Sequence, residues 1–228
     1  MITSSGNPRL KRVRKLLSAG KYRDATGLFA AEGEDLVEAA AAAGIEPVDL
    51  LVAGETVDAT LLAAVSTLPH PARAIGVYRR ADLPTGARAV TVALWRLADP
   101  GNVGTLLRSA DAFGASVALS DGCADPLSPK ALRASAGAIF RVPLVEWGNA
   151  PEPRVALVAH DGRALDDVLA GLEPPLTLLL GAERAGLPDD LVTQCHEATI
   201  HLPGGAESLN VAAAGAIALY ELSRSLLR

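Results

Sequence analysis

The chain lacks the features that mark several common classes of protein. Its 228 residues include two cysteines, Cys123 and Cys195, which stand far apart without metal-like spacing. We therefore predict reduced thiols in a cytoplasmic protein rather than a disulfide framework. No apolar run approaches the roughly 20 residues of a membrane span, so we expect no membrane contact. The basic N-terminal residues are not followed by an apolar segment, which argues against a signal peptide.

Several ligand-binding motifs are also missing. The chain has no G-x-G-x-x-G, which argues against an ordinary dinucleotide site, and no G-x-x-x-x-G-K-[ST], which argues against a P-loop ATPase. No nucleophile elbow is present. The four histidines show no metal-binding spacing, so we predict no metal site. The composition that remains, 50% hydrophobic and 21% charged, is typical of a soluble globular protein with one large domain or two modest ones.

The net charge of −5 hides an asymmetry between the two ends of the chain. The first 23 residues hold seven basic side chains and no acidic one, whereas the remaining 205 hold 14 basic and 26 acidic side chains. A basic arm on an acidic body indicates a polyanionic partner that is bound through one end. The alternative is that these basic residues form an ordinary solvated face of a helix and bind no partner. We favour nucleic acid, and the predicted RNA-binding residues are Arg9, Lys11, Arg12, Arg14, Lys15 and Arg23.

Residues 1–81 are predicted to form a small α/β unit. Asn7 and Pro8 suit the start of a helix that runs to Ala19, with Gly20 closing it. Its apolar residues share one face at helical spacing: Leu10, Val13, Leu16 and Leu17. Further patterns predict helices at 35–43 and 56–68 and strands at 48–53 and 73–78. The segment 82–88, which contains Pro and Gly, is predicted to be a linker.

Residues 89–228 show a regular alternation of apolar runs and helical patterns. Near-continuous apolar strands separated by helices predict a parallel sheet that is covered on both faces. The runs are 90–95, 116–120, 155–159, 176–180 and 198–202. Ligands bind outside the carboxyl ends of the strands in such sheets. We therefore expect the site in the loops after Trp95, Leu180 and Leu202.

The first stretch with chemical character is 98–115. Asn102 is predicted to cap its helix. A helical side chain leans toward the N-terminus, so Arg108 should reach back over Gly104, where a guanidinium beside a helix start suits a phosphate. The alternative is a surface arginine paired with Asp111. The buried face of the helix is expected to comprise Val103, Leu106, Leu107, Ala110 and Phe113.

Two later stretches lie at the ends of predicted strands. A buried strand ends at Gly181, where backbone can meet a ligand, and Glu183 follows in the loop. The alternative role of Glu183 is to cap a helix that starts near Pro188. The last stretch runs from a Pro-Gly-Gly loop at 203–205 to Ser208, which is predicted to cap a long Ala-rich helix.

Together the three stretches resemble the three motifs of the SpoU (TrmH-like) RNA ribose 2′-O-methyltransferases of the SPOUT superfamily. The patterns are N-x-G-x-x-x-R at 102–108, G-x-E-x-x-G-L at 181–187 and G-G-A-E-S-L-N-V-A at 204–212. S-P-K to G-A-I-F, at 128–140, is similar to a further family segment. S-G-N-P at residue 5 and F-A-A-E-G at residue 29 resemble the RNA-recognition domain of such enzymes. The resemblance therefore covers nearly the whole chain.

The resemblance implies an α/β protein in which a small L30e-like α/β domain precedes a SPOUT-type parallel sheet with a deep trefoil knot. It implies S-adenosylmethionine as cofactor and a homodimer with active sites at the subunit interface. The implied reaction is methylation of a ribose 2′-hydroxyl in RNA, with 23S ribosomal RNA favoured. A transfer RNA methyltransferase, or a non-catalytic RNA-binding ribosome assembly factor on the same fold, remains open.

The resemblance also assigns residues to roles. The implied cofactor contacts are Gly181, Ile200 and Leu209. The implied catalytic and substrate-positioning residues are Asn102, Arg108, Glu183, Ser208 and Asn210. A guanidinium does not deprotonate in ordinary protein settings, so we expect Arg108 to orient the 2′-hydroxyl and stabilise negative charge, while Glu183 positions a neighbouring donor. His201 replaces a proline that is frequent in the family and Ala212 replaces a serine; neither change touches the expected catalytic set.

Overall fold

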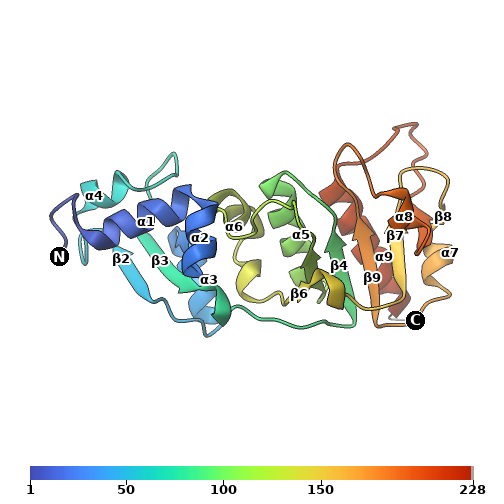
Figure 1. The fold of residues 1–228 in the computed structure, drawn as a ribbon, viewed down its shortest axis with the longest axis horizontal. Helices are drawn as coiled ribbons and strands as arrows, with labels where there is room; N and C mark the ends of the chain where they lie inside the picture. Colours follow the sequence, from blue (N-terminus) through green and yellow to red (C-terminus); the bar gives the residue numbers. More distant parts are fainter. Residues whose placement is uncertain (227–228) are drawn as a thin grey trace.

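The computed structural model describes residues 1–226 and shows two sheets side by side in an elongated molecule (Figure 1). A smaller sheet belongs to the N-terminal part of the chain and a larger one to the C-terminal part. Residues 227–228 of the predicted C-terminal domain lie outside the described residues. Among the described residues, no helix is long and apolar enough to cross a bilayer.

The N-terminal sheet is antiparallel. Its strands lie in the order β1 (Leu28–Glu32), β3 (Ala74–Arg79) and β2 (Asp49–Val52). Its helices are α1 (Pro8–Ser18), α2 (Gly20–Thr26), α3 (Glu34–Ala42) and α4 (Ala59–Ala63). The predicted helices at 8–19 and 35–43 and the predicted strands at 48–53 and 73–78 are confirmed, with ends that differ by one residue.

Helix α1 follows the sequence prediction closely. The side chain of Asn7 accepts a hydrogen bond from the backbone N–H of Arg9, and Pro8 occupies the first helical position. All four predicted apolar residues are buried: Leu10, Val13, Leu16 and Leu17. The basic residues are thereby left on the other faces of the helix.

Three N-terminal predictions are wrong in detail. Gly20 begins α2 rather than closing α1, because Ala19 adopts an extended conformation that ends the first helix. The helix predicted at 56–68 shrinks to α4, and strand β1 was not predicted. The buried carboxylate of Glu32 accepts hydrogen bonds from the hydroxyl groups of Ser66 and Thr67. These bonds tie the second half of the predicted helix to β1 as an irregular segment.

The C-terminal sheet has seven strands, and every neighbouring pair is parallel, as predicted. In spatial order they are β6 (Leu144–Glu146), β5 (Ser116–Leu119), β4 (Val90–Leu94), β9 (Leu176–Leu180), β7 (Arg154–Leu157), β10 (His196–Thr199) and β8 (Arg163–Ala164). Four predicted runs are confirmed. The run predicted at 198–202 begins two residues earlier and ends three residues earlier, and the short strands β6 and β8 were not predicted.

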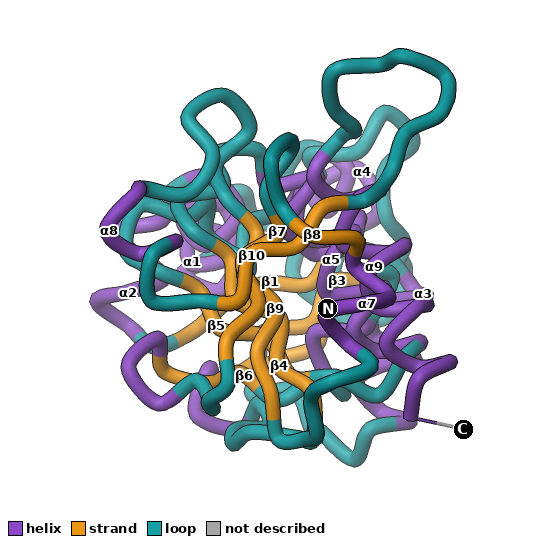
Figure 2. Tube along the Cα trace, turned by 90° about the vertical axis from the view of Figure 1, so that its right-hand side faces the viewer, coloured by secondary structure: helices purple, strands orange, loops and turns teal. Residues whose placement is uncertain are grey.

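Helices lie on both sides of this sheet. The larger ones are α5 (Pro100–Ala112), α6 (Pro129–Ser135), α7 (Leu165–Leu169) and α9 (Val211–Leu226). Figure 2 shows α5, α7 and α9 on one side of the strands and the short α8 (Asp189–Val192) on the other. Strand residues alternate accordingly: Val92 and Leu94 enter the core under the helices, whereas Ala93 belongs to a smaller cluster on the opposite face.

The two units share one hydrophobic core. The rings of Phe29 and Tyr78 from the N-terminal sheet pack against Phe140, with centroid distances of 6.0 and 5.3 Å. Phe140 lies in the 3₁₀ helix η2 (Ala138–Phe140). Leu83, from the segment predicted as a linker, is buried in the same core. The segment is therefore anchored to the core through Leu83 rather than fully exposed to solvent.

Candidate functional site

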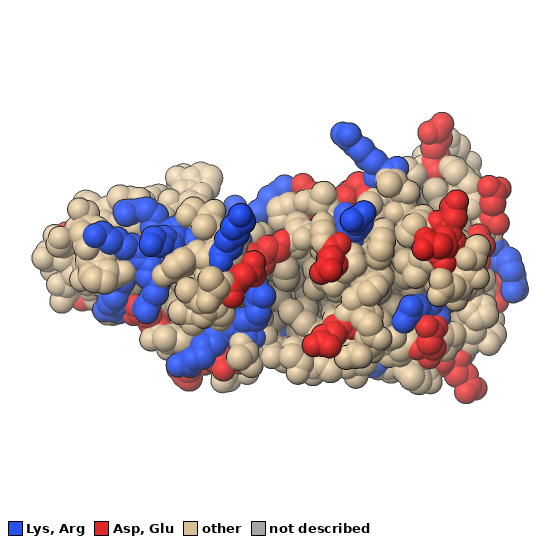
Figure 3. All heavy atoms as spheres, viewed as in Figure 1, with Lys and Arg blue, Asp and Glu red and all other residues tan. Residues whose placement is uncertain are grey.

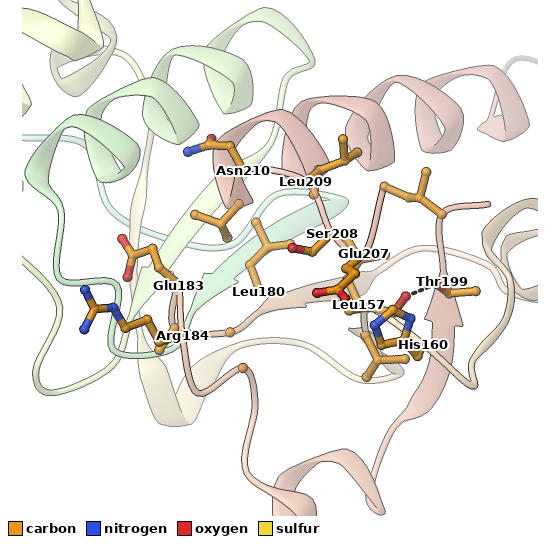
Figure 4. A pocket seen from close by; sticks show the side chains of 18 of the residues that line it. Leu157, His160, Leu180, Glu183, Arg184, Thr199, Glu207, Ser208, Leu209 and Asn210 are labelled. Carbon is orange, nitrogen blue, oxygen red and sulfur yellow. Dashed lines mark hydrogen bonds between the residues drawn. The ribbon is translucent and has the colours of Figure 1, made fainter. Parts of the chain in front are cut away.

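A cavity of about 700 Å³ opens at the carboxyl ends of β9, β7 and β10, the edge at which the sequence predicts a ligand site (Figure 4). Three loops line it: 157–160 after β7, 180–186 after β9, and 199–211 between β10 and α9. The predicted cofactor contacts, Gly181, Ile200 and Leu209, all belong to this lining.

A chain of side-chain hydrogen bonds joins the three predicted stretches at the rim of the cavity. The amide nitrogen of Asn102 donates to Glu183 at 3.0 Å, and the amide nitrogen of Asn210 donates to the oxygen of Asn102 at 3.1 Å. Asn210 in turn accepts bonds from the backbone N–H groups of Ala212 and Ala213. Residues 108 positions apart are thus held in one polar relay.

Glu183 also fixes the loop that leads into α5. Its two carboxylate oxygens accept hydrogen bonds from the backbone N–H groups of Ala98 and Asp99, each at 3.2 Å. Burial raises the pKa of Glu183, but the bonds from Asn102 and from these backbone groups outweigh it, so the pKa lies below its ordinary value. Glu183 is therefore an anionic anchor that holds the amide of Asn102, and it does not cap α8, which has no side-chain cap.

Both predicted N-caps are wrong, and the correction explains the relay. Asp99 caps α5 by accepting from the N–H groups of Gly101 and Asn102, so the side chain of Asn102 is released toward Glu183. Asn210 supplies the cap contacts at the start of α9, while Ser208 is exposed in the loop before it.

The glycines of the first two motifs are required by packing. A Cβ on Gly104 would lie 2.3 Å from the carbonyl oxygen of Ala131, where α5 crosses α6. A Cβ on Gly181 would lie 2.3 Å from the backbone of Gly186. Gly104 thus allows two helices to approach, and Gly181 allows the loop after β9 to fold back beside the cavity.

Arg108 lies apart from the other predicted catalytic residues. It is exposed on α5 and does not line the cavity, and among the described residues its guanidinium makes no ion pair. The alternative partner, Asp111, is bonded instead to Arg141 at 2.6 Å. Phe113, predicted to be buried, is 36% exposed near the end of the same helix. The buried positions predicted at 103, 106, 107 and 110 are confirmed.

Sequence reasoning missed four polar residues of the cavity: His160, Arg184, Thr199 and Glu207 (Figure 4). His160 follows β7 and Arg184 follows β9, so the rule that ligands bind at the carboxyl ends of strands could have identified both. His201, which was considered because it replaces a family proline, is exposed and does not line the cavity. No cluster of potential metal ligands occurs among the described residues.

The predicted RNA-binding residues divide into three groups. Lys11, Arg14 and Lys15 are exposed on α1. Arg9 and Arg12 are half-buried, and both bond to the carboxylate of Asp49. Figure 3 shows Lys and Arg gathered over the N-terminal unit at the left, whereas Asp and Glu predominate at the right.

Arg23 is a correction to the predicted RNA surface. It is 5% exposed, and its guanidinium bonds to Asp125 at 2.7 Å and to the carbonyl oxygen of Leu16 at 2.6 Å. Asp125 belongs to the C-terminal unit. Arg23 therefore ties the two units together and is not available to a phosphate.

Two family models match this chain. The SpoU rRNA Methylase family matches residues 89–220, and an MRM3-like substrate binding domain matches residues 7–80. The chain belongs to the SpoU rRNA methylase family. Its fold and the meeting of its three motif stretches agree with that membership.

Similar proteins of known name include ribosomal RNA methyltransferases. A 23S rRNA (guanosine(2553)-2′-O)-methyltransferase, RlmP of Bacillus subtilis, is 32% identical over 97% of this chain and 98% of its own length. The AdoMet-bound rRNA methyltransferase from Sinorhizobium meliloti superimposes with a TM-score of 0.86 at 31% identity, covering 100% of this chain and 98% of that one. The SpoU methyltransferase AviRb from Streptomyces viridochromogenes, in complex with AdoMet, gives 0.84 at 26% identity, covering 97% and 98%.

Proposed function

We propose that this SpoU-family protein methylates a ribose 2′-hydroxyl of RNA with S-adenosylmethionine as cofactor, and that 23S ribosomal RNA is the substrate. The relay Glu183–Asn102–Asn210 carries the proposal, because it holds residues of all three motifs at the rim of one cavity. A protein that only bound RNA would not need this arrangement. The names of the relatives from Bacillus subtilis and Streptomyces viridochromogenes support ribosomal RNA over transfer RNA.

The cavity suits S-adenosylmethionine in size and chemistry. Its volume of about 700 Å³ falls within the range of ordinary cofactor pockets. Apolar side chains from three elements (Leu157, Leu180 and Leu209) line it beside the polar Ser208 and Glu207. Gly181, Ile200 and Leu209 would hold the cofactor, with Gly181 leaving backbone accessible. When bound, S-adenosylmethionine supplies a methyl group on a sulfonium.

The chain's own residues would act by positioning and by electrostatics. Asn102 and Asn210 have their amides fixed by Glu183 and by the start of α9, so they can orient a ribose without rearranging first. Arg108 would bind the substrate phosphate and stabilise the charge that develops as the 2′-hydroxyl loses its proton to a substrate phosphate or to solvent. Ser208, exposed at the cavity, would contact the substrate.

A homodimer would complete this site. Three large apolar side chains outside the cavity lie exposed at the end of α5 and on α9: Phe113, Ile217 and Tyr220. The ring centroids of Phe113 and Tyr220 are 6.4 Å apart, so α5 and α9 contribute to one exposed aromatic contact. Arg108 is exposed on α5 and lies outside the cavity of its own chain. We propose that this exposed surface pairs with a second copy and that Arg108 acts across the interface.

We also propose the trefoil knot and a cytoplasmic location. In support of the knot, β9 is inserted between β4 and β7, and the loop after β10 lines the cavity and leads to α9, which packs on α5. In support of the cytoplasm, Cys123 and Cys195 are free thiols.

Labelled S-adenosylmethionine and separated RNA classes test the proposed function. We expect label on one ribose 2′-oxygen of 23S ribosomal RNA, with none on transfer RNA. Label on transfer RNA alone would move the substrate to that class. Intact cofactor binding without label on any RNA, including unmodified transcripts and assembly intermediates, would favour a non-catalytic RNA-binding protein.

A further inference from the structure

The two tryptophans of the chain lie against each other at the carboxyl edge of the large sheet. Trp95 directly follows β4, and Trp147 opens the 3₁₀ helix η3 (Trp147–Asn149) after β6. Their ring centroids are 5.4 Å apart, and both side chains are half-buried. Trp147 packs on the small-residue cluster that includes Ala93 and Ala118. The pair is thus supported from beneath while part of each ring remains accessible.

Arg96 adds a cation to this pair. Its guanidinium carbon lies 5.8 Å from the centroid of the Trp95 ring. The residue is exposed, and its backbone has a positive φ of 50°, a conformation that is uncommon for a side chain of this size. A hydrogen bond from its N–H to the hydroxyl of Ser120 holds it there. The guanidinium makes no hydrogen bond or ion pair among the described residues.

The tryptophan–arginine group lies between the cavity and the basic helices. On one side, Ala98 and Asp99 follow in the chain, and Glu183 binds their N–H groups. On the other side, the stem of Arg96 lies against Gly122, a residue that also lines a second cleft of about 410 Å³. That cleft runs between the two units of the molecule.

The charges of the second cleft are mostly internally balanced. Lys21, Asp24 and Arg80 line it from the N-terminal unit, and Asp121 and Asp125 from the C-terminal unit. Arg80 is paired with Asp24, and Asp125 with Arg23. Lys21 is therefore the cation left facing the cleft among the described residues, and Asp121 the anion. The cleft joins α2 to Gly122, against which the stem of Arg96 lies.

We propose that Trp95, Arg96 and Trp147 form a stacking platform for an unpaired RNA base next to the methylated nucleotide. The proposal rests on the proposed function. Unstacked bases of RNA loops bind on aromatic rings and on guanidinium planes. This group presents both beside the segment at Ala98 and Asp99 that Glu183 holds. Bases inside a duplex are covered by their neighbours and cannot stack in this way. The platform would therefore select single-stranded or bulged RNA.

The test uses the tryptophans as their own reporters, because both belong to the platform. A single-stranded, adenosine-rich oligoribonucleotide with a fluorescent label is titrated into the full chain, and a duplex of equal length serves for comparison. Anisotropy of the label measures binding, and tryptophan emission measures stacking. We expect emission to fall with the single strand in parallel with anisotropy, and to stay constant with the duplex.

Matched variants assign the signal to side chains. Glycine tolerates a positive φ, so Arg96→Gly removes the guanidinium while relieving backbone strain. Arg96→Gly and Trp95→Leu should each weaken single-strand binding by about 5- to 100-fold. Trp95→Phe keeps an aromatic face and should retain most of the affinity. Arg163→Ala, at the opposite edge of the sheet, should change affinity by less than about twofold.

Four results would overturn the platform. They are constant tryptophan emission while anisotropy saturates, equal quenching by duplex, no saturable single-strand binding, and unchanged affinity in both Arg96→Gly and Trp95→Leu. Methyl transfer by these variants separates this proposal from the enzymatic one. Full activity in both variants at limiting RNA refutes the platform alone, whereas a wild-type protein that labels no RNA refutes the proposed function.

Discussion

The two ends of the molecule differ in what their polar side chains are bonded to. On α1, three basic residues (Lys11, Arg14 and Lys15) face solvent. At the cavity, Glu183, Asn102 and Asn210 are bonded to one another and to backbone N–H groups. Exposed charges adapt to any polyanion, whereas interlocked amides hold one geometry. We therefore infer that the N-terminal unit supplies electrostatic affinity for RNA, whereas the C-terminal unit supplies the chemistry and the proposed base-stacking contact.

Arg108→Ala is the change with the largest expected effect, because Arg108 is assigned to chemistry although it is as exposed as the α1 cations. We expect turnover to fall about 100- to 1,000-fold, the scale of losing one group that stabilises transition-state charge. RNA affinity should change little. Single-turnover methyl transfer at saturating RNA measures this, with Arg163→Ala as the control. Near-normal turnover would show that Arg108 has no role in the chemical step and contributes at most to RNA binding, like the basic residues of α1.

Arg23→Ala should act on stability, because this arginine is buried. The substitution removes charge-assisted hydrogen bonds to Asp125 and to the backbone of Leu16. We expect the free energy of unfolding in denaturant to fall by about 2 to 3 kcal/mol. The exposed neighbour Lys21 provides the control, since Lys21→Ala should change stability by less than about 0.5 kcal/mol. Unchanged stability together with weakened RNA binding would show that Arg23 binds RNA, as the sequence predicted.

Neutralising the exposed face of α1 should have a moderate effect on binding and none on the chemical step. In the triple variant Lys11→Ala, Arg14→Ala and Lys15→Ala, RNA affinity should fall about 10-fold, and the slope of log affinity against log salt should decrease by about 2 to 3. Turnover at saturating RNA should match the wild type. A lower turnover with an unchanged salt slope would show that these residues of α1 act in the chemical step rather than in RNA binding.

Glu183 carries the smallest predicted effect, a dependence of stability on pH. Its folded-state pKa lies below the ordinary value of 4.5, so the stability from its ionised form is complete at neutral pH. That contribution is lost as the pH falls below 4.5 through the folded-state pKa. The Tm of the wild type should exceed that of Glu183→Gln at neutral pH, and the two should converge in acid. A gap that stays constant would show that Glu183 is not the titrating group.

The helices and strands could be predicted from the sequence wherever the spacing of apolar residues distinguishes a helix from a strand. The apolar face of α1, the four longer runs of the parallel sheet and the buried face of α5 all follow from spacing. Strands β6 and β8 have three and two residues and are too short to show a period. The segment 64–68 has helical spacing. However, the buried carboxylate of Glu32 in β1 accepts hydrogen bonds from Ser66 and Thr67, and these bonds replace the last turns of the predicted helix.

The membership of the site was predictable, whereas its bonding was not. All three cofactor-contact residues and Glu183, Ser208 and Asn210 line one cavity. The helix caps, however, belong to Asp99 and Asn210 rather than to Asn102 and Ser208. Either residue of each pair is a good cap by type. The choice depends on where each helix begins: Asp99 and Asn210 directly precede α5 and α9, whereas Asn102 lies inside the first turn of α5 and Ser208 in the loop before α9.

The sequence by itself determined the family, the parallel sheet, the place of the ligand site and the excess of basic charge at one end. These depend on residue type and short-range spacing. Only the tertiary structure decided which charges are used internally, as for Arg23, and which residues join across the chain, as for Glu183, Asn102 and Asn210. A hydrogen bond depends on the positions of two groups to within a few tenths of an ångström. That precision arises when separate elements pack, and no local pattern carries it.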